Sequence, residues 1–74
     1  MKTETLCHFK QDNYNLKLIK ETSVFKDYAG ISNIKIIYRV TLNRKNQGKS
    51  LYEYSMRKLF SLICQNIVLQ LKIY

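Results

Sequence analysis

The tripeptide Gly48-Lys49-Ser50 resembles the end of a nucleotide-binding P-loop, in which backbone amides and a lysine hold phosphates. It follows a predicted strand and opens a predicted helix, but the earlier glycine that a P-loop needs is replaced by Asn43. The chain that follows is too short for the parallel sheet that positions a metal-binding acid. A solvated turn is one interpretation. The other is an anion site at this helix N-terminus, whose free amides and dipole attract phosphates and on which Arg44, Lys45 and Lys49 would converge.

Cys7-His8 is the second pair of residue types that can do chemistry. A structural zinc site needs four ligands, and the other thiol is Cys64. Side chains adjacent in a strand point to opposite faces, so a Cys/His catalytic pair is disfavoured. The carboxylates are scattered, at Asp12, Glu21, Asp27 and Glu53. We therefore expect two reduced thiols and a protein that is not an enzyme and uses no metal or cofactor.

The composition is strongly basic. Thirteen Lys and Arg residues face five Asp and Glu residues, for a net charge of +8. Such a balance favours polyanionic partners, namely nucleic acid, a nucleoprotein or an anionic membrane, although it also serves solubility or an acidic protein partner. Phe25, Tyr28 and Tyr54 are candidates for exposed aromatic rings that stack on bases. The candidate nucleic-acid or anion-binding residues are Lys17, Lys35, Arg39, Arg44, Lys45, Lys49 and Ser50.

Two strands must position these cations. Apolar residues alternate with polar ones in residues 13–20 and again in residues 34–42, the pattern of half-buried strands. If the two pair antiparallel, Lys35 and Arg39 lie near Lys17 and form a basic stripe. Residues 21–32 are expected to be a long connection with a turn at Tyr28-Ala29-Gly30, and residues 43–49 a basic loop. Residues 1–12 fit an edge strand or an arm.

A helix is predicted to begin at the capping box Ser50-Leu51-Tyr52-Glu53. Its apolar stripe, at three- and four-residue spacing, comprises Tyr52, Met56, Leu59, Phe60, Ile63 and Ile67. It either stops near Gln65-Asn66, leaving a strand over residues 67–74, or continues to residue 72. The expected class is α+β, a small antiparallel sheet of two or three strands with one amphipathic helix across it, in a single domain over residues 1–74.

The apolar C-terminal segment suggests a second surface. It is interrupted by polar residues and falls short of a transmembrane span. The N-terminus has no signal-peptide core, so a cytoplasmic protein is expected. Exposed apolar patches mark interfaces, so a homodimer or a host-protein contact is predicted. Arg57 and Lys58 also permit peripheral membrane binding. The candidate protein-interface residues are Leu59, Phe60, Ile63, Leu69 and Leu71.

Three segments carry a family resemblance: residues 38–44, Gly48-Lys49-Ser50, and residues 52–56. Together they resemble small uncharacterised proteins encoded by bacteriophages and prophages. The resemblance implies no reaction. It does imply an accessory role in which a small protein binds a host complex, for example as an anti-CRISPR or other anti-defence inhibitor. With a charge of +8, such an inhibitor would compete for RNA or dock on an acidic patch.

Overall fold

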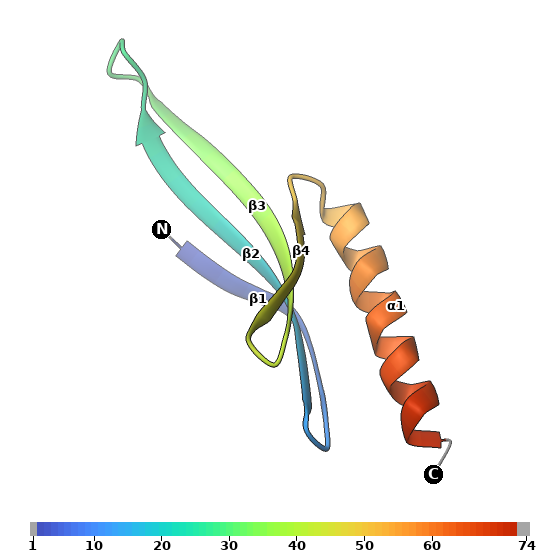
Figure 1. Ribbon diagram of the computed structural model, residues 1–74. Helices are drawn as coiled ribbons and strands as arrows, with labels where there is room; N and C mark the ends of the chain where they lie inside the picture. Colours follow the sequence, from blue (N-terminus) through green and yellow to red (C-terminus); the bar gives the residue numbers. More distant parts are fainter. Residues whose placement is uncertain (1, 73–74) are drawn as a thin grey trace.

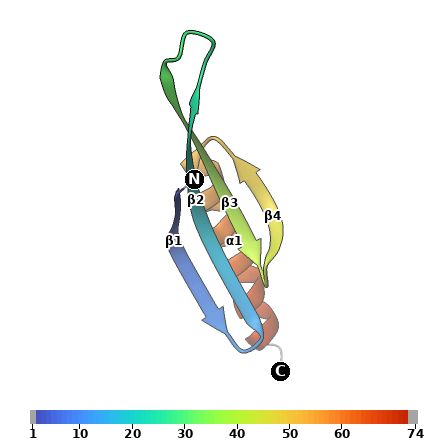
Figure 2. The ribbon, with the colours of Figure 1, turned by 90° about the vertical axis from the view of Figure 1, so that its left-hand side faces the viewer.

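The computed structural model describes residues 2–72, with backbone alone for residues 71 and 72. The elements are β1 (Lys2–Gln11), β2 (Tyr14–Lys26), β3 (Ser32–Leu42), β4 (Lys45–Ser50) and α1 (Glu53–Lys72). The strands form one antiparallel sheet in the order β1-β2-β3-β4, and α1 packs across it (Figures 1 and 2). The α+β class is confirmed. The sheet has four strands, where the sequence predicted two or three.

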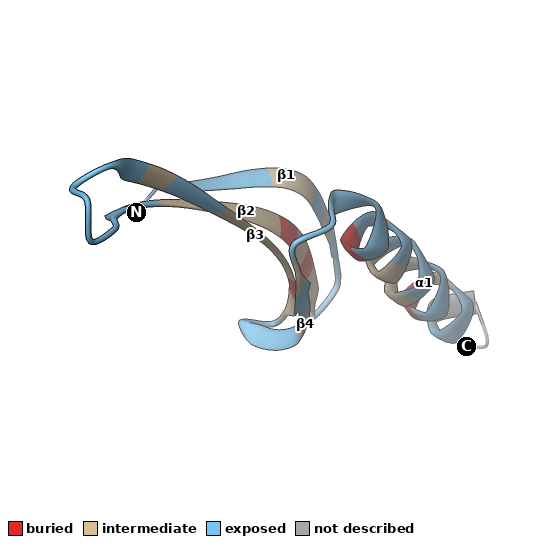
Figure 3. Cartoon of the chain, turned by 90° about the horizontal axis from the view of Figure 1, so that it is seen from above, coloured by how far each residue is buried: buried red, intermediate tan, exposed pale blue. Residues whose placement is uncertain are grey.

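The core lies between α1 and the strand residues that alternate toward it. Leu16 and Leu18 of β2 are fully buried beside Val40 of β3, which is the cross-strand partner of Leu18. Met56 and Ile67 of α1 close this cluster from the helix side. The buried positions are red in Figure 3 and gather where α1 meets the sheet. The predicted alternation in residues 13–20 and 34–42 is therefore the pattern that builds the core.

The expected loop over residues 43–49 is instead a tight turn followed by most of β4. Asn43 and Arg44 have φ angles of 51° and 70°, as a two-residue type I′ hairpin turn requires. The Asn43 amide donates to the Asn15 carbonyl over 2.9 Å, and its side-chain oxygen accepts the Asn15 amide at the same distance. The segment looked like a loop because β4 is a polar edge strand without apolar alternation. Gly48 is part of β4 and passes beneath the helix.

Replacing Arg44 with glycine is expected to raise the free energy of unfolding by about 0.5–1 kcal/mol. A left-handed φ costs an ordinary residue roughly 1–2 kcal/mol, and glycine offsets part of that relief through its unfolded-state entropy. The melting temperature should rise by a few degrees in thermal unfolding followed by circular dichroism. Lys45→Gly, one residue into the strand, should lower it. A fall with Arg44→Gly would contradict the strained-turn interpretation.

Residues 23–37 form an arm that extends past the other two strands. β1 pairs with β2 only as far as Thr22, and β4 pairs with β3 only from Tyr38. The molecule is accordingly long, with extents of 59 × 19 × 16 Å (Figure 1). The expected connection over residues 21–32 is wrong, because β2 continues to Lys26. Its polar residues conceal the strand, since in the arm neither face is covered.

The predicted turn at the arm's tip is confirmed. The Gly30 amide donates to the Asp27 carbonyl over 3.0 Å, and Gly30 takes a left-handed φ of 77°. The Asp27 carboxylate accepts the amides of Ile31 and Ala29. These hydrogen bonds, that of Ile31 foremost, hold the pKa of Asp27 below its usual range. The arm exposes large apolar side chains, namely Val24, Phe25, Tyr28, Ile31 and Ile34.

The helix α1 begins at Glu53 and continues to Lys72, so the alternative of a strand over residues 67–74 is wrong. Residues 73–74 lie outside the described part. Ser50 ends β4, and its hydroxyl oxygen accepts the Tyr52 amide over 3.0 Å, not the Glu53 amide of the predicted capping box. Tyr52 is 72% exposed and does not join the packing stripe. Near the other end, the Tyr14 hydroxyl donates to Gln70.

Gly48 sets how closely α1 approaches the sheet. A Cβ at this position would lie 2.8 Å from a terminal methyl carbon of Leu59. The glycine of the P-loop-like tripeptide therefore makes room for the helix. Within residues 2–72, no helix combines the length and the apolar character that crossing a membrane requires.

Candidate functional site

The sheet face that points away from α1, called the open face, gathers positive charge from every strand. Its residues are those that alternate with the core positions, and no described element covers it (Figure 3). Its basic strand residues are Lys10, Lys17, Lys35, Arg39 and Lys49. Among the described strand residues, Glu21 is the single acid on this face. The predicted basic stripe of Lys17, Lys35 and Arg39 does lie on one face.

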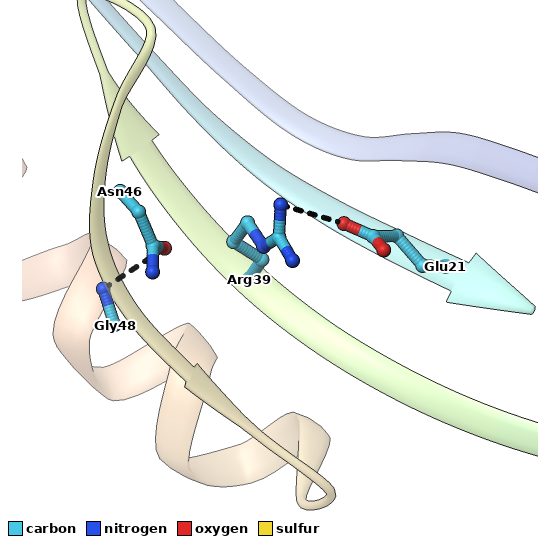
Figure 4. Close-up of polar contacts among 4 residues, drawn as sticks. All are labelled: Glu21, Arg39, Asn46 and Gly48. Atoms are coloured by element: carbon cyan, nitrogen blue, oxygen red, sulfur yellow. Dashed lines mark hydrogen bonds and ion pairs between the residues drawn. The ribbon is translucent and has the colours of Figure 1, made fainter.

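Arg39 occupies the middle of the open face and is engaged by Glu21. Its guanidinium lies 3.2 Å from the Glu21 carboxylate on the neighbouring strand (Figure 4). The two side chains are 35% and 15% exposed. The Nε atom of Arg39 is buried and has no hydrogen-bond partner. The Arg39 charge is thus largely compensated, and the surrounding lysines supply the positive charge of this face.

A hollow of about 250 Å³ lies at one end of the open face, beside the β3–β4 turn. It is lined by Asn15, Lys17, Ile19, Thr41 and Arg44, and we call it the turn hollow. The Asn15–Asn43 hydrogen bonds fix the turn against β2, which places Arg44 next to Lys17. An anionic group in this hollow would meet two cations and the Asn15 side chain.

A second hollow, of about 330 Å³, lies at the other end of β4. We call it the edge hollow, and it is lined by Lys35, Ile37, Lys49, Ser50 and Leu51. Lys35 and Lys49 are exposed, while Ile37 is half-buried between the cations. This end therefore combines positive charge with apolar surface.

The structure separates some of the cations that the sequence grouped. Arg44 lies in the turn, Lys45 begins β4, and Lys49 lies near the end of β4, roughly 13–17 Å away along the strand. The predicted convergence of all three on the helix N-terminus is therefore wrong. Lys45 lies opposite Leu42, a core-side position, and is not on the open face. Ser50 borders the edge hollow, but its oxygen already accepts the Tyr52 amide.

Sequence reasoning missed the contribution of β1. Lys10 lies opposite Asn15, and His8 lies opposite Lys17, so both side chains belong to the open face. The His8 ring is hydrogen-bonded to the Asn15 side chain. The signal was the alternation of His8 and Lys10 with Cys7 and Phe9, which pack toward the core. The structure forms an edge strand over Lys2–Gln11, and choosing the strand alternative for this segment would have revealed the contribution of β1.

The predicted protein-interface residues divide between core and surface. Leu59, Phe60 and Ile63 pack against the core beneath α1, so the protein's own sheet covers them. Leu69 is 59% exposed, and it borders a shallow hollow of about 310 Å³ with Cys64, Gln65 and Val68. The side chain of Leu71 lies outside the described residues. The sheet therefore covers part of the surface that Leu59, Phe60 and Ile63 could offer to a partner, while Leu69 stays open.

The cysteines and carboxylates form no cluster. Cys7 and Cys64 are free thiols, and Arg57 donates to the Cys7 sulfur over 3.5 Å while pairing with Glu53. The raised pKa of Arg57 comes chiefly from its hydrogen bond to Glu53. In residues 2–72, no three His, Cys, Asp or Glu side chains gather where they could hold a metal ion.

No family model matches this chain, and the curated proteins and solved structures contain no match to it either. Functional inference for this protein consequently depends on the surfaces of the fold itself. The open face is the most strongly charged of these surfaces, and the arm is the most apolar.

Proposed function

We propose that this protein binds nucleic acid, free or within a nucleoprotein, by holding the phosphate backbone on its open face. The supporting observation is the concentration of cations from all strands on one uncovered face. The acidic strand residue on this face, Glu21, is already paired with Arg39. Uncompensated lysines on a common surface attract phosphates and release the counterions condensed on them. The binding is non-enzymatic, and we place it in the cytoplasm as part of the same proposal.

The spacing of the cations suits a repeating polyanion. Same-face neighbours along a strand are about 7 Å apart, so Lys35 lies about 13 Å from Arg39 along β3. Lys49 is the cross-strand partner of Arg39, and Lys17 pairs with Thr41 two residues further on. The cations thus follow β3 for about 20 Å and end at Arg44 in the turn hollow. Several successive phosphates of one strand fit along this path.

The apolar residues of the open face indicate which part of the nucleic acid is held. Ile19 and Ile37 lie between the cations, and aromatic rings that stack on bases are not interleaved with them. The open-face aromatic is Phe25, which lies out on the arm. Proteins that stack bases use aromatic rings. We therefore propose that the open face contacts the sugar-phosphate backbone of the nucleic acid and binds any base sequence.

Salt dependence tests this proposal. Fluorescence anisotropy with a labelled 20-nucleotide strand and a 20-base-pair duplex measures affinity between 50 and 200 mM salt. About four phosphate contacts should weaken duplex binding roughly a hundredfold over this range, with a slightly shallower slope for the single strand. Probes of different base sequence should bind alike. Poly-glutamate of matched charge is the control. Equal binding to poly-glutamate, or affinity indifferent to salt, would refute phosphate recognition.

A further inference from the structure

The outer edge of β3 is open along the arm. β4 covers β3 from Tyr38 to Leu42, so residues 32–37 have no described strand on that side. In an antiparallel sheet, every second residue of such an edge points its N–H and C=O groups outward. An uncovered edge of this length is a template on which another extended chain pairs.

The side chains around this edge suit an added strand. The edge hollow lies where β4 leaves the sheet, with Ile37 and Leu51 as its apolar wall. Leu51 is 62% exposed, and Ile34 on the opposite face of the arm is 68% exposed. A strand laid beside residues 32–37 would present one set of alternate side chains to Lys35 and Lys49 on the open face and the other set to Ile34 on the opposite face.

We propose that this edge binds an extended, acidic peptide segment of a partner protein. The segment pairs with residues 32–37 of β3, in line with β4 and past its end. Backbone hydrogen bonds would supply affinity, and the surfaces for alternate side chains would supply specificity. The acid nearest to these lysines on the open face, Glu21, is paired with Arg39 and leaves them uncompensated. Charge therefore selects a peptide that alternates carboxylates with apolar side chains.

A second copy of the chain fits this edge less well. Antiparallel pairing of two β3 edges about a twofold axis would bring Lys35 of each copy close together, and like charges across strands are destabilising. Each copy also carries a net charge of +8. The arm itself gains from an acidic third strand, because an isolated two-stranded ribbon is only marginally stable in water. The inference does not depend on nucleic-acid binding by the open face.

The test uses a blocked eight-residue peptide of alternating valine and glutamate, titrated into isotope-labelled full-length protein. Alternate amides within residues 32–37 should gain protection from hydrogen exchange, while amides of β1 should not. Two further peptides carry N-methyl groups on either the odd or the even residues. One should lose binding and the other should keep it, because only one set of N–H groups faces β3. Equal binding by both, or no saturable binding at millimolar peptide, would overturn the proposal.

Lys35→Glu should weaken peptide binding up to about fivefold, the range of a surface charge contact. Lys58→Glu, an exposed change on α1, makes the same difference in net charge and should leave binding unchanged.

Two other occupants would overturn the inference. One is a dimer in sedimentation whose edge amides are protected without peptide, and the other is a nucleic-acid probe that protects them when the peptide does not. Failure of the salt test would leave the peptide result standing.

Discussion

Replacing Lys17, Arg44 and Lys49 with glutamate is expected to weaken nucleic-acid binding at least about a hundredfold. The three residues belong to the hollows at both ends of the open face. Each lost surface charge contact is worth up to about 1 kcal/mol, and about 3 kcal/mol corresponds to roughly a hundredfold in affinity. Repulsion between the new carboxylates and phosphates adds to this loss. Anisotropy with the 20-base-pair duplex at 50 mM salt measures the effect.

The matched control replaces Lys2, Lys45 and Lys58 with glutamate. These lysines are exposed, they do not belong to the open face, and their replacement changes the net charge by the same amount. The control triple variant should lose affinity only severalfold, because its lower net positive charge weakens the long-range attraction to the phosphates. Circular dichroism should show both variants folded, since surface substitutions usually alter stability by about 0.5 kcal/mol or less each. An equal loss of affinity in both triple variants would contradict a defined site on the open face, because net charge alone would then explain binding.

Leu18→Ala is expected to lower the free energy of unfolding by about 2–5 kcal/mol. Leu18 is fully buried, faces Val40 across the strands and belongs to the cluster that Met56 and Ile67 complete. Its truncation leaves a cavity that the rigid sheet cannot close. A chain of this size has a total stability of only about 4–11 kcal/mol, so this loss removes a large share of it.

Urea unfolding followed by circular dichroism checks this value. Leu62→Ala is the matched control, because Leu62 lies on α1 with half of its surface exposed. It should cost less than about 1 kcal/mol. Equal losses for the two leucines would mean that α1 does not pack on the sheet through the face described above.

The residues that build the core could be predicted from the sequence. Leu16, Leu18 and Val40 alternate with polar residues, and burial on one face of a strand imposes that alternation. Met56 and Ile67 recur at helical spacing for the same reason. The pattern also identified the open face, because residues that alternate with core positions must point the other way. Lys17, Lys35 and Arg39 followed directly from it.

The elements that the sequence concealed are those without a buried face. β4 is a polar edge strand, and Gly48, which lies close to the helix, has no side chain that would add an apolar position to the pattern. The arm's strands are uncovered on both faces, so burial imposes no pattern on residues 23–26. The grouping of Arg44 with Lys49 failed for a related reason. The chain reverses at Asn43 and Arg44, which both have positive φ angles. Without a glycine at the second position, the sequence gives little indication of such a turn.

The order of the strands in the sheet repeats their order along the chain, and this bears on how the protein folds. Every strand pairs with its immediate neighbours in sequence, across the short connections at residues 12–13, 27–31 and 43–44. Closing such short loops costs little entropy, so each hairpin can form before distant segments meet. Sheets with such local contacts fold faster than those with crossed connections. The docking of α1 onto β2, which joins distant parts of the chain, is then the natural late event of folding.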